Sequence, residues 1–406
     1  MTDVRAPLEL PNGAVLANRI VKSAMSEALA DAHNNPTQDL ISAYAQWGRS
    51  GAGLLITGNT PVDRWHLEHA ANVVLDADTD LERMQALVAA AQAEGAKIIA
   101  QIAHAGRQTP AAINPAPVSI SAVQLDLPGY GAPQPASDAQ LRNVIAQFVQ
   151  AALQAQEAGF DGVEIHAAHG YLLSSALSPR INTRQDAWGG VLDNRARLAI
   201  EVVRAVRAAA APTFIVAVKL NSSDFQKGGF DLTEAAQVAV MLQNEGVDFI
   251  EISGGTFEAP TAYQHTARRA STQAREAYFL DYAAQIKSVL SIPLMVTGGF
   301  RSRAVMDAAI ADGKTDLIGI GRPFIIDPAF PTKLLAGEMS RVPDVESQFP
   351  PADELPRGAV LNWFCTQLAQ LGRTGAADPG LALLDGHARY LEQIEDATRA
   401  VLAARR

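Results

Sequence analysis

Short apolar runs rich in β-branched residues alternate with longer alanine-rich stretches between residues 20 and 337 of this chain. This alternation predicts parallel strands joined by helices that cover the sheet. Eight successive strand-helix units favour an α/β fold of the closed (β/α)8 TIM barrel type over an open, doubly wound sheet. The eight expected strands lie at residues 20–22, 54–57, 97–102, 163–165, 214–220, 249–252, 293–297 and 317–320.

Helix-forming stretches lie between the expected strands. We expect helices at residues 81–94, 138–158, 192–210, 233–245 and 303–311, with capping residues at Thr79, Ser137, Asp231 and Ser302. An Asn-Gly pair at residues 12–13, between two apolar runs, predicts a β-hairpin over residues 8–16. The barrel pattern stops near Glu338, and the sequence that follows ends in an amphipathic helix. We therefore expect a barrel domain at residues 1–337 and a helical tail at 338–406 that packs on the barrel or on a partner subunit.

The amino-acid composition is typical of a globular enzyme. Of the 406 residues, 48% are apolar and 19% are charged, which provides for a large buried core and excludes a largely disordered chain. The net charge of -10 disfavours a nucleic-acid partner. The one cysteine, Cys365, excludes an internal disulfide and a cysteine-ligated iron–sulfur cluster, and it indicates a reducing compartment. Because no signal-type or membrane-length apolar run is present, we expect a cytoplasmic protein without a membrane partner.

Residues with chemically useful side chains or flexible backbones follow directly after the expected strands. Because barrel enzymes carry out their chemistry at the carboxyl ends of the strands, we expect these residues to face one site. In chain order they are Ser23, Ala24, Met25 and Ser26, then Gly58 and Asn59, Gln101 and His104, His166, His169 and Tyr171, Lys219 and Asn221, Ser253, Gly254 and Gly255, Thr297, Gly298 and Gly299, and finally Gly319, Gly321 and Arg322.

Glycines end the last two expected strands. Gly298, Gly299 and Gly321 allow backbone N–H groups to approach a phosphate closely, and Arg322 can bind the same anion through two parallel hydrogen bonds. A Gly-Gly pair alone is more often only a turn. Two glycine-containing strand ends on the last strands of a barrel, where this fold often binds phosphate, predict a phosphate group in the site.

Two histidines and a tyrosine follow the fourth expected strand. His166 and His169 can donate hydrogen bonds to a carbonyl oxygen, and Tyr171 can deliver a proton beside it. Each also has a structural interpretation, the histidines as satisfied core residues and Tyr171 as a core aromatic. A His-x-x-His pair can bind a metal, but no carboxylate or cysteine lies at a typical ligand spacing, so we expect no metal.

Three connections are long compared with the others. They are residues 108–136, 171–191 and 256–279, and the last one carries Tyr263 and His265. Loops of this length usually cover a functional site or move. The shape of a substrate pocket depends mainly on such loops, so the sequence leaves the substrate open.

Four segments closely resemble the Old Yellow Enzyme family of flavin-dependent ene-reductases. They are residues 101–107, 162–173, 178–190 and 321–323, and they occur in the order that this family shows. The resemblance extends over residues 5–335. It implies a barrel that binds FMN noncovalently, is reduced by NAD(P)H and passes electrons to a small unsaturated carbonyl compound.

The resemblance also implies roles for individual residues. Ser23, Ala24, Met25 and Ser26 would lie along the flavin ring, Gln101 would bind its pyrimidine edge, Asn59 or Gly58 would contact its reactive edge, and Gly298, Gly299, Gly321 and Arg322 would bind its phosphate. Lys219 would supply positive charge for an anionic reduced flavin, although it can also form an ion pair with Glu164 or Glu251. The sequence departs from the family at Ala24, usually proline, at Ser26, usually threonine or cysteine, and at Lys219, commonly arginine.

Three functional hypotheses follow from these residues. In the first, the protein uses NAD(P)H and FMN to reduce the C=C bond of electron-poor alkenes such as enones and nitroalkenes. His166 and His169 would then stabilise negative charge on the substrate oxygen, and Tyr171 would supply the proton. The alternatives are a flavin-free, phosphate-binding isomerase or lyase and a noncatalytic flavin-binding protein. The tail is compatible with a homo-oligomer.

Overall fold

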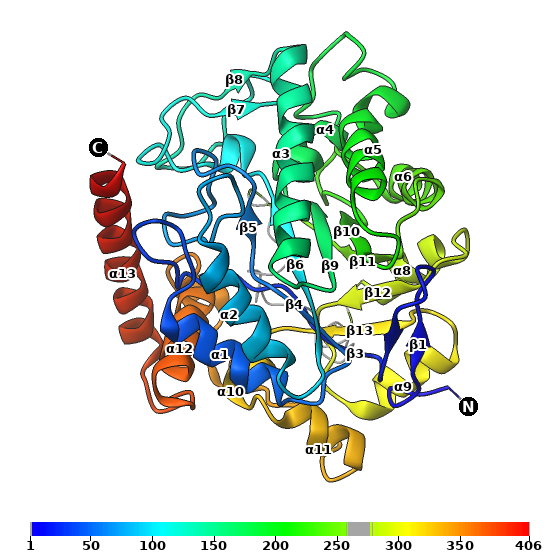
Figure 1. The fold of residues 1–406 in the computed structure, drawn as a ribbon, viewed down its shortest axis with the longest axis vertical. Helices are drawn as coiled ribbons and strands as arrows, with labels where there is room; N and C mark the ends of the chain where they lie inside the picture. Colours follow the sequence, from blue (N-terminus) through cyan, green and yellow to red (C-terminus); the bar gives the residue numbers. More distant parts are fainter. Residues whose placement is uncertain (1, 257, 259–276, 278, 406) are drawn as a thin grey trace.

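Eight parallel strands form a closed barrel in the computed structural model of the chain (Figure 1). The structure describes residues 2–256, 258, 277 and 279–405. In their order around the barrel, the strands are β3 (Ile20–Lys22), β4 (Leu54–Ile56), β6 (Lys97–Ala103), β9 (Gly162–Ala167), β10 (Ile215–Asn221), β11 (Phe249–Ser253), β12 (Leu294–Thr297) and β13 (Leu317–Ile320). Pairing of β13 with β3 closes the sheet. The (β/α)8 barrel is confirmed, and the ends of all eight strands lie within two residues of their predicted positions.

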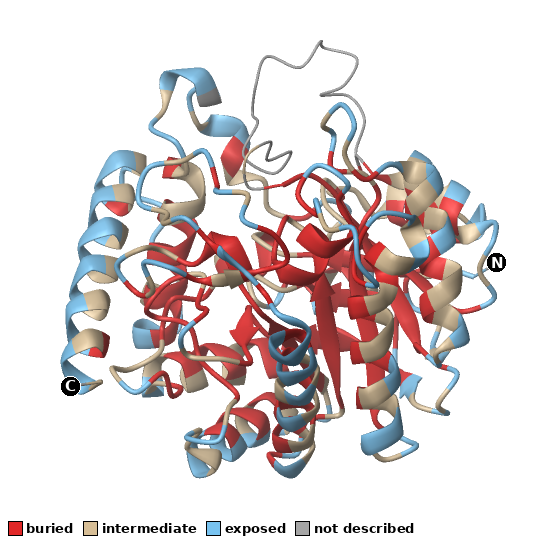
Figure 2. Ribbon diagram, turned by 90° about the horizontal axis from the view of Figure 1, so that it is seen from above, coloured by how far each residue is buried: buried red, intermediate tan, exposed pale blue. Residues whose placement is uncertain are grey.

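Helices surround the barrel, and their outer faces are exposed while the strands are buried (Figure 2). Both faces of a parallel sheet are covered in this way, which explains why the strands are continuous apolar runs. Among the described residues, no helix is both long and apolar enough to cross a membrane. In chain order, the helices are α1 (Gln38–Gly48), α2 (Leu81–Gln92), α3 (Asp138–Glu157), α4 (Leu172–Leu177), α5 (Leu192–Ala209), α6 (Leu232–Asn244), α8 (Leu280–Lys287), α9 (Arg303–Ala311), α10 (Pro323–Ile326), α11 (Phe330–Ala336), α12 (Ala359–Thr374) and α13 (Leu383–Ala404).

Side-chain caps begin several of these helices. The side chains of Asp80, Ser137 and Asp231 accept backbone N–H groups at the starts of α2, α3 and α6. The caps of α3 and α6 were expected. The expected cap of α2 was wrong, because Thr79 lies one residue too early and its hydroxyl donates to a loop carbonyl instead. Ser302 precedes α9 as expected, but its side chain makes no capping hydrogen bond.

An apolar core fills the barrel toward the amino ends of its strands. Successive side chains on a strand point to opposite faces, so every second residue points into the barrel. The expected hairpin is present as β1 (Leu8–Glu9) and β2 (Val15–Leu16). Its residues Leu10 and Leu16 are buried with the barrel core and close the amino-terminal end. The strands contribute Val21, Leu54, Ile56, Ile99, Ile215, Ala217, Phe249, Met295 and Leu317 to this core.

The two helices of the tail pack on the side of the barrel that carries α1. α12 contacts α1 and α10, and α13 runs alongside α12 at the edge of the molecule (Figure 1). Gly372 allows the close approach of α12 to α1, because a Cβ there would lie 2.3 Å from the carbonyl oxygen of Asp39. On α13, Val401 is buried against Leu67 and Val74, which belong to the loop before α2.

The long connections carry short elements of their own. Arg184, from the connection at 171–191, donates to the carbonyls of Ile120 and Ala136, so this loop is fixed to the connection at 108–136. Most of the connection at 256–279, including Tyr263 and His265, lies outside the described residues. Short elements in these and other connections are β5 (Thr60–Pro61), η1 (Gly106–Gln108), β7 (Val118–Ser119), β8 (Gln134–Pro135), η2 (Val345–Gln348) and η3 (Ala352–Glu354).

Candidate active site

A cavity of about 720 Å³ lies at the carboxyl ends of the barrel strands. This volume is within the range of roughly 300–1,000 Å³ that is typical of small-molecule and cofactor sites. Three of the residues expected to face the site, Gly58, His104 and Asn221, are not part of its wall. The wall does include Ser23, Ala24, Met25, Ser26, Asn59, Gln101, His166, His169, Tyr171, Lys219, Gly298, Gly299, Gly321 and Arg322.

His166 lines the cavity at the end of β9 as a neutral ring. Burial is the main reason why the pKa of His166 lies well below its usual value, and the charges of His169 and Lys219 add to the effect. Its Nδ1 accepts the N–H of Ala168 at 3.2 Å, so the one proton of the neutral ring lies on Nε2. The ring of Tyr171 stands perpendicular to it, with centroids 4.8 Å apart. An N–H donor and a phenol therefore lie side by side.

His169 adopts a left-handed backbone conformation with φ of 61°. This conformation is strained for a residue other than glycine and is kept only where the surroundings hold it. Asn221 Oδ1 accepts the backbone N–H of His169 at 3.2 Å, and Gln108 Nε2 donates to its carbonyl at 2.8 Å. The ring Nε2 lies 2.8 Å from Ser253 Oγ. Burial lowers the pKa of His169 to about 3, so this ring is also neutral, with its centroid 5.1 Å from that of His166.

A layer of polar side chains forms the floor of the cavity, directly above the apolar barrel core. Gln101 Nε2 donates to Glu164 Oε2 at 2.6 Å, and Lys219 Nζ lies 2.7 Å from Glu251 Oε1. The two glutamates are 0% exposed and Lys219 is 4% exposed. The ion pair that was one of the two interpretations of Lys219 is therefore present. Lys219 also lines the cavity, so the two interpretations are compatible.

Glu68 is a cavity residue that the sequence did not single out. Its Oε1 accepts a hydrogen bond from Ser26 Oγ at 2.8 Å, and its Oε2 accepts one from Asn59 Nδ2 at 3.2 Å. The amide oxygen of Asn59 is buried and has no hydrogen-bond partner among the described residues. Burial, with a smaller contribution from the Glu68 charge, raises the pKa of nearby Tyr130 to about 12.

The glycines after β12 and in β13 leave space for a ligand or a close neighbour. Gly298 and Gly299 have φ of 116° and 82°, which side chains with a Cβ rarely adopt. A Cβ on Gly319 would lie 1.9 Å from Thr297 Oγ1. Backbone groups at these positions are therefore accessible in a way that larger residues would prevent.

Arginines next to these glycines are held by a residue of the tail. Glu346 Oε1 lies 3.0 Å from Arg322 Nε and 3.1 Å from Arg301 Nη2. The Arg322 guanidinium also lies over the ring of Phe364, 5.6 Å from its centroid. Phe364 lines the cavity together with Cys365 and residues 355–361. The tail thus completes the cavity wall, a role that the sequence did not indicate.

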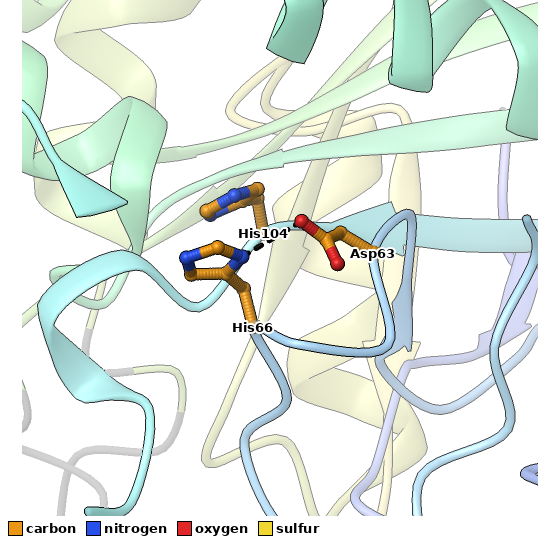
Figure 3. A group of neighbouring side chains, drawn as sticks. All are labelled: Asp63, His66 and His104. Atoms are coloured by element: carbon orange, nitrogen blue, oxygen red, sulfur yellow. Dashed lines mark hydrogen bonds and ion pairs between the residues drawn. The ribbon is translucent and has the colours of Figure 1, made fainter. Parts of the chain in front are cut away.

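Asp63 and the buried His66 and His104 form a cluster of metal-ligand type outside this wall (Figure 3). His66 Nε2 accepts the N–H of Val118, so its proton lies on Nδ1 and is donated to Asp63 Oδ2 at 2.8 Å. The rings of His66 and His104 stack with centroids 4.2 Å apart and an interplanar angle of 26°. The lone pairs of stacked rings lie in nearly parallel planes and do not converge on one ion. The contacts favour a hydrogen-bonded network that ties the loop after β5 to the end of β6.

The fold and this site define a class of barrel enzyme in which glycines and arginines line one cavity together with two histidines and a tyrosine. The sequence profile of the NADH:flavin oxidoreductase / NADH oxidase family matches residues 4–340. The NADH-dependent flavin oxidoreductase nadA of Aspergillus parasiticus is 36% identical over 374 residues, which span 87% of this chain and 82% of that protein. The chain belongs to the NADH:flavin oxidoreductase / NADH oxidase family, as the resemblance to Old Yellow Enzymes implied.

Two solved structures share the fold. A 2-naphthoyl-CoA reductase in complex with 2-naphthoyl-CoA matches with a TM-score of 0.79 and 23% identity, over 90% of this chain and 58% of that one. The Old Yellow Enzyme homologue from Zymomonas mobilis matches with a TM-score of 0.71 and 24% identity, over 86% of this chain and 97% of that one. The family membership makes the protein an NAD(P)H-dependent flavin oxidoreductase with noncovalently bound FMN.

Proposed function

We propose that this protein reduces the C=C bond of electron-poor alkenes, enones first and nitroalkenes second. The observation that carries the proposal is the grouping of His166, His169 and Tyr171 at one cavity wall. The ring centroids of His169 and Tyr171 lie 5.1 Å and 4.8 Å from that of His166, and two neutral donors beside a phenol suit a substrate with a carbonyl oxygen and an adjacent carbon that needs a proton.

The cavity residues fit FMN. The left-handed Gly298 and Gly299, with Gly321 and the two arginines held by Glu346, suit a phosphate group. The unpartnered amide oxygen of Asn59 suits an N–H of the flavin ring. We assign the ring to the wall formed by Ser23, Ala24, Met25, Ser26, Asn59, Gln101 and Lys219. When bound, FMN accepts a hydride from NAD(P)H and passes it to the β-carbon of the substrate.

The histidines stabilise the charge that hydride arrival creates. Negative charge develops on the carbonyl oxygen as the β-carbon is reduced, so donors aimed at that oxygen lower the barrier. His166 donates from Nε2–H. His169 is the second donor, and Asn221 holds its backbone through a hydrogen bond. Because both rings are neutral, they bind the substrate oxygen without introducing a full positive charge. Tyr171 then protonates the α-carbon.

A flavin-free isomerase or lyase would need Lys219 as a base or a Schiff-base nucleophile. Such a lysine requires a lowered pKa. Burial acts in that direction, but the interactions with the carboxyl groups of Glu251 and, second, Glu164 outweigh it and raise the pKa of Lys219. The ammonium paired with Glu251 is therefore the wrong form for this chemistry.

The test measures flavin reduction and flavin reoxidation separately in the Tyr171→Phe variant, by stopped-flow absorbance of the flavin. Reduction by NAD(P)H should be nearly unchanged, whereas reoxidation by cyclohexenone should slow by roughly 10²- to 10⁴-fold, as expected for a lost general acid. A nitroalkene should be affected less, because its product can take a proton from water. Tyr282→Phe is the matched control, since Tyr282 packs on Phe225 and does not line the cavity. If the Tyr171→Phe variant is reoxidised by cyclohexenone at the rate of the parent enzyme, Tyr171 is excluded as the acid.

A further inference from the structure

Three ionisable side chains are packed together beneath the cavity. Glu164, Lys219 and Glu251 come from the consecutive strands β9, β10 and β11, and we call them the floor cluster. Lys219 and Glu251 are direct partners in the pairing of β10 with β11, and their charged groups lie 2.7 Å apart. Glu164 is the direct partner of Gln101, which donates to its Oε2. All members of the cluster are buried.

The floor cluster holds two carboxyl groups but one ammonium group. A buried carboxylate needs a counter-charge, so one carboxyl must keep its proton. Glu164 Oε1 and Glu251 Oε2 are buried and have no hydrogen-bond partner among the described residues. Lys219 and Thr297 also hydrogen-bond to Glu251, and a proton carried by one carboxyl group is the donor that can join Glu164 to Glu251. The cluster is therefore neutral when one of the two carboxyl groups carries a proton.

The protonation state agrees with the surroundings of each carboxyl group. Burial, with the charge of Glu251, raises the pKa of Glu164 well above its usual value. Burial would also raise the pKa of Glu251, but the ammonium of Lys219 outweighs it and lowers that pKa. The proton therefore resides on Glu164, and Glu251 is the carboxylate that can accept another.

The remaining ionisable groups near the floor cluster do not replace this balance. His166 and His169 face it from the cavity and are neutral. Lys22, on β3, directs its ammonium to the outside of the barrel, 4.3 Å from the ring centroid of Trp47 and 4.0 Å from Glu27 Oε1. A change of charge in the cavity therefore acts mainly on Lys219 and, through it, on Glu251.

We propose that the floor cluster is a redox-linked proton store, which holds one proton on its two carboxyl groups when the flavin is oxidised and two when it is reduced. This inference rests on the proposed function, because it requires hydride transfer to FMN in this cavity. Hydride transfer from NAD(P)H adds two electrons and one proton to the cofactor, and hence one negative charge. The balancing proton comes from solvent and binds to the carboxylate of Glu251. Lys219 is then released from its ion pair and compensates the new charge, and the stored proton returns to solvent on reoxidation.

The proposal predicts the pH dependence of the flavin midpoint potential. For a two-electron couple, a tenfold change in equilibrium constant corresponds to 29.6 mV, so each coupled proton contributes about 30 mV per pH unit. The holoenzyme should show about 60 mV per pH unit near neutrality, although its reduced flavin has the absorbance of the anionic form. An infrared difference spectrum of reduced minus oxidised enzyme should show a gain of protonated carboxyl.

Variants locate the second proton. The double substitution Glu164→Gln and Glu251→Gln should halve the slope to about 30 mV per pH unit and remove the carboxyl signal. Asp248→Asn is the matched control, because Asp248 is a buried carboxylate just before the same strand β11, at the opposite end of the barrel. Its slope should equal that of the parent enzyme.

The parent enzyme alone can refute the proposal if the double variant does not fold. A slope of about 30 mV per pH unit with an anionic reduced flavin would mean that no second proton is bound. A neutral reduced flavin would place the second proton on the ring instead of on the floor cluster. Either result refutes the proton store but does not contradict the proposed alkene reduction. A failure of the proposed function would appear as loss of alkene turnover while the pH slope of the flavin midpoint potential stays unchanged.

Discussion

Replacing Lys219 by methionine tests how strongly the cavity floor depends on its ion pair. Methionine keeps a long apolar side chain but removes the ammonium that lies 2.7 Å from Glu251 Oε1. Glu251 is 0% exposed, so its carboxylate would remain buried without a counter-charge. Removing one partner of a buried ion pair typically costs about 3–5 kcal/mol. This cost is a large part of a net stability of about 5–15 kcal/mol.

The loss of stability in Lys219→Met should grow as the pH rises. In the parent protein, the pKa of Glu251 is lowered, so its carboxylate stabilises the folded state. This stabilisation is fully present above the unfolded pKa of about 4.3 and is lost as the pH falls. In the variant, burial is no longer opposed, so the pKa of Glu251 rises above its unfolded value. The folded state then binds more protons than the unfolded state, and stability decreases from about pH 4.3 upward through the folded pKa. Lys219 also lowers the pKa of Glu164, so its removal raises that pKa further and acts in the same direction.

Urea unfolding, followed by circular dichroism at several values between pH 5 and pH 8, measures this difference. We expect the gap in unfolding free energy between parent and variant to widen with pH. Adding Glu251→Gln to Lys219→Met removes the unpaired charge and should recover most of the loss. A gap below about 1 kcal/mol, or one that is equal at pH 5 and pH 8, would refute a charged Lys219–Glu251 pair in the barrel floor.

Three further predictions concern the cavity wall. Gly319→Ala should reduce the flavin content of the purified protein, because its Cβ would lie 1.9 Å from Thr297 Oγ1. The ratio of flavin absorbance to protein absorbance measures this content, and full flavin occupancy would refute the prediction. Asn221→Ala should slow alkene reduction roughly tenfold, or about 1.4 kcal/mol, by releasing the strained backbone of His169, and an unchanged rate would contradict that role. Cys365 should label slowly with a thiol reagent at pH 8, since burial raises its pKa to about 12, and rapidly in urea; rapid labelling of the native protein would contradict this burial.

The barrel could be predicted from the sequence because its determinants are local. Each strand is a short apolar run buried on both faces, and several helices begin at a side-chain cap. The same locality placed His166, Tyr171 and Arg322 correctly in the cavity wall, because residues just after barrel strands converge on one face. The family resemblance then attached chemistry to positions that the strand pattern had already brought together.

Contacts between distant segments could not be predicted in this way. Glu68 lies in a loop without a recognisable pattern, and its role depends on the positions of Ser26 and Asn59. Glu346 follows the barrel by several residues, and nothing in its neighbourhood indicates that it binds two arginines of the cavity. The ion pair of Lys219 was foreseen only as an alternative, because adjacent-strand register decides which glutamate it meets.

The departures from the family at Ala24 and Ser26 occur where residues from outside the barrel strands support the cavity. The hydroxyl of Ser26 donates to Glu68, while its carbonyl accepts the thiol of Cys365 at 3.4 Å. Cys365 and Phe364 belong to α12, beyond the residues 4–340 that match the family profile. The wall assigned to the flavin ring is thus fixed from one side by a barrel loop and from the other by the tail. We infer that the tail is part of the cofactor site, so differences among relatives in cofactor properties should depend on α12 as well as on the family's shared strands.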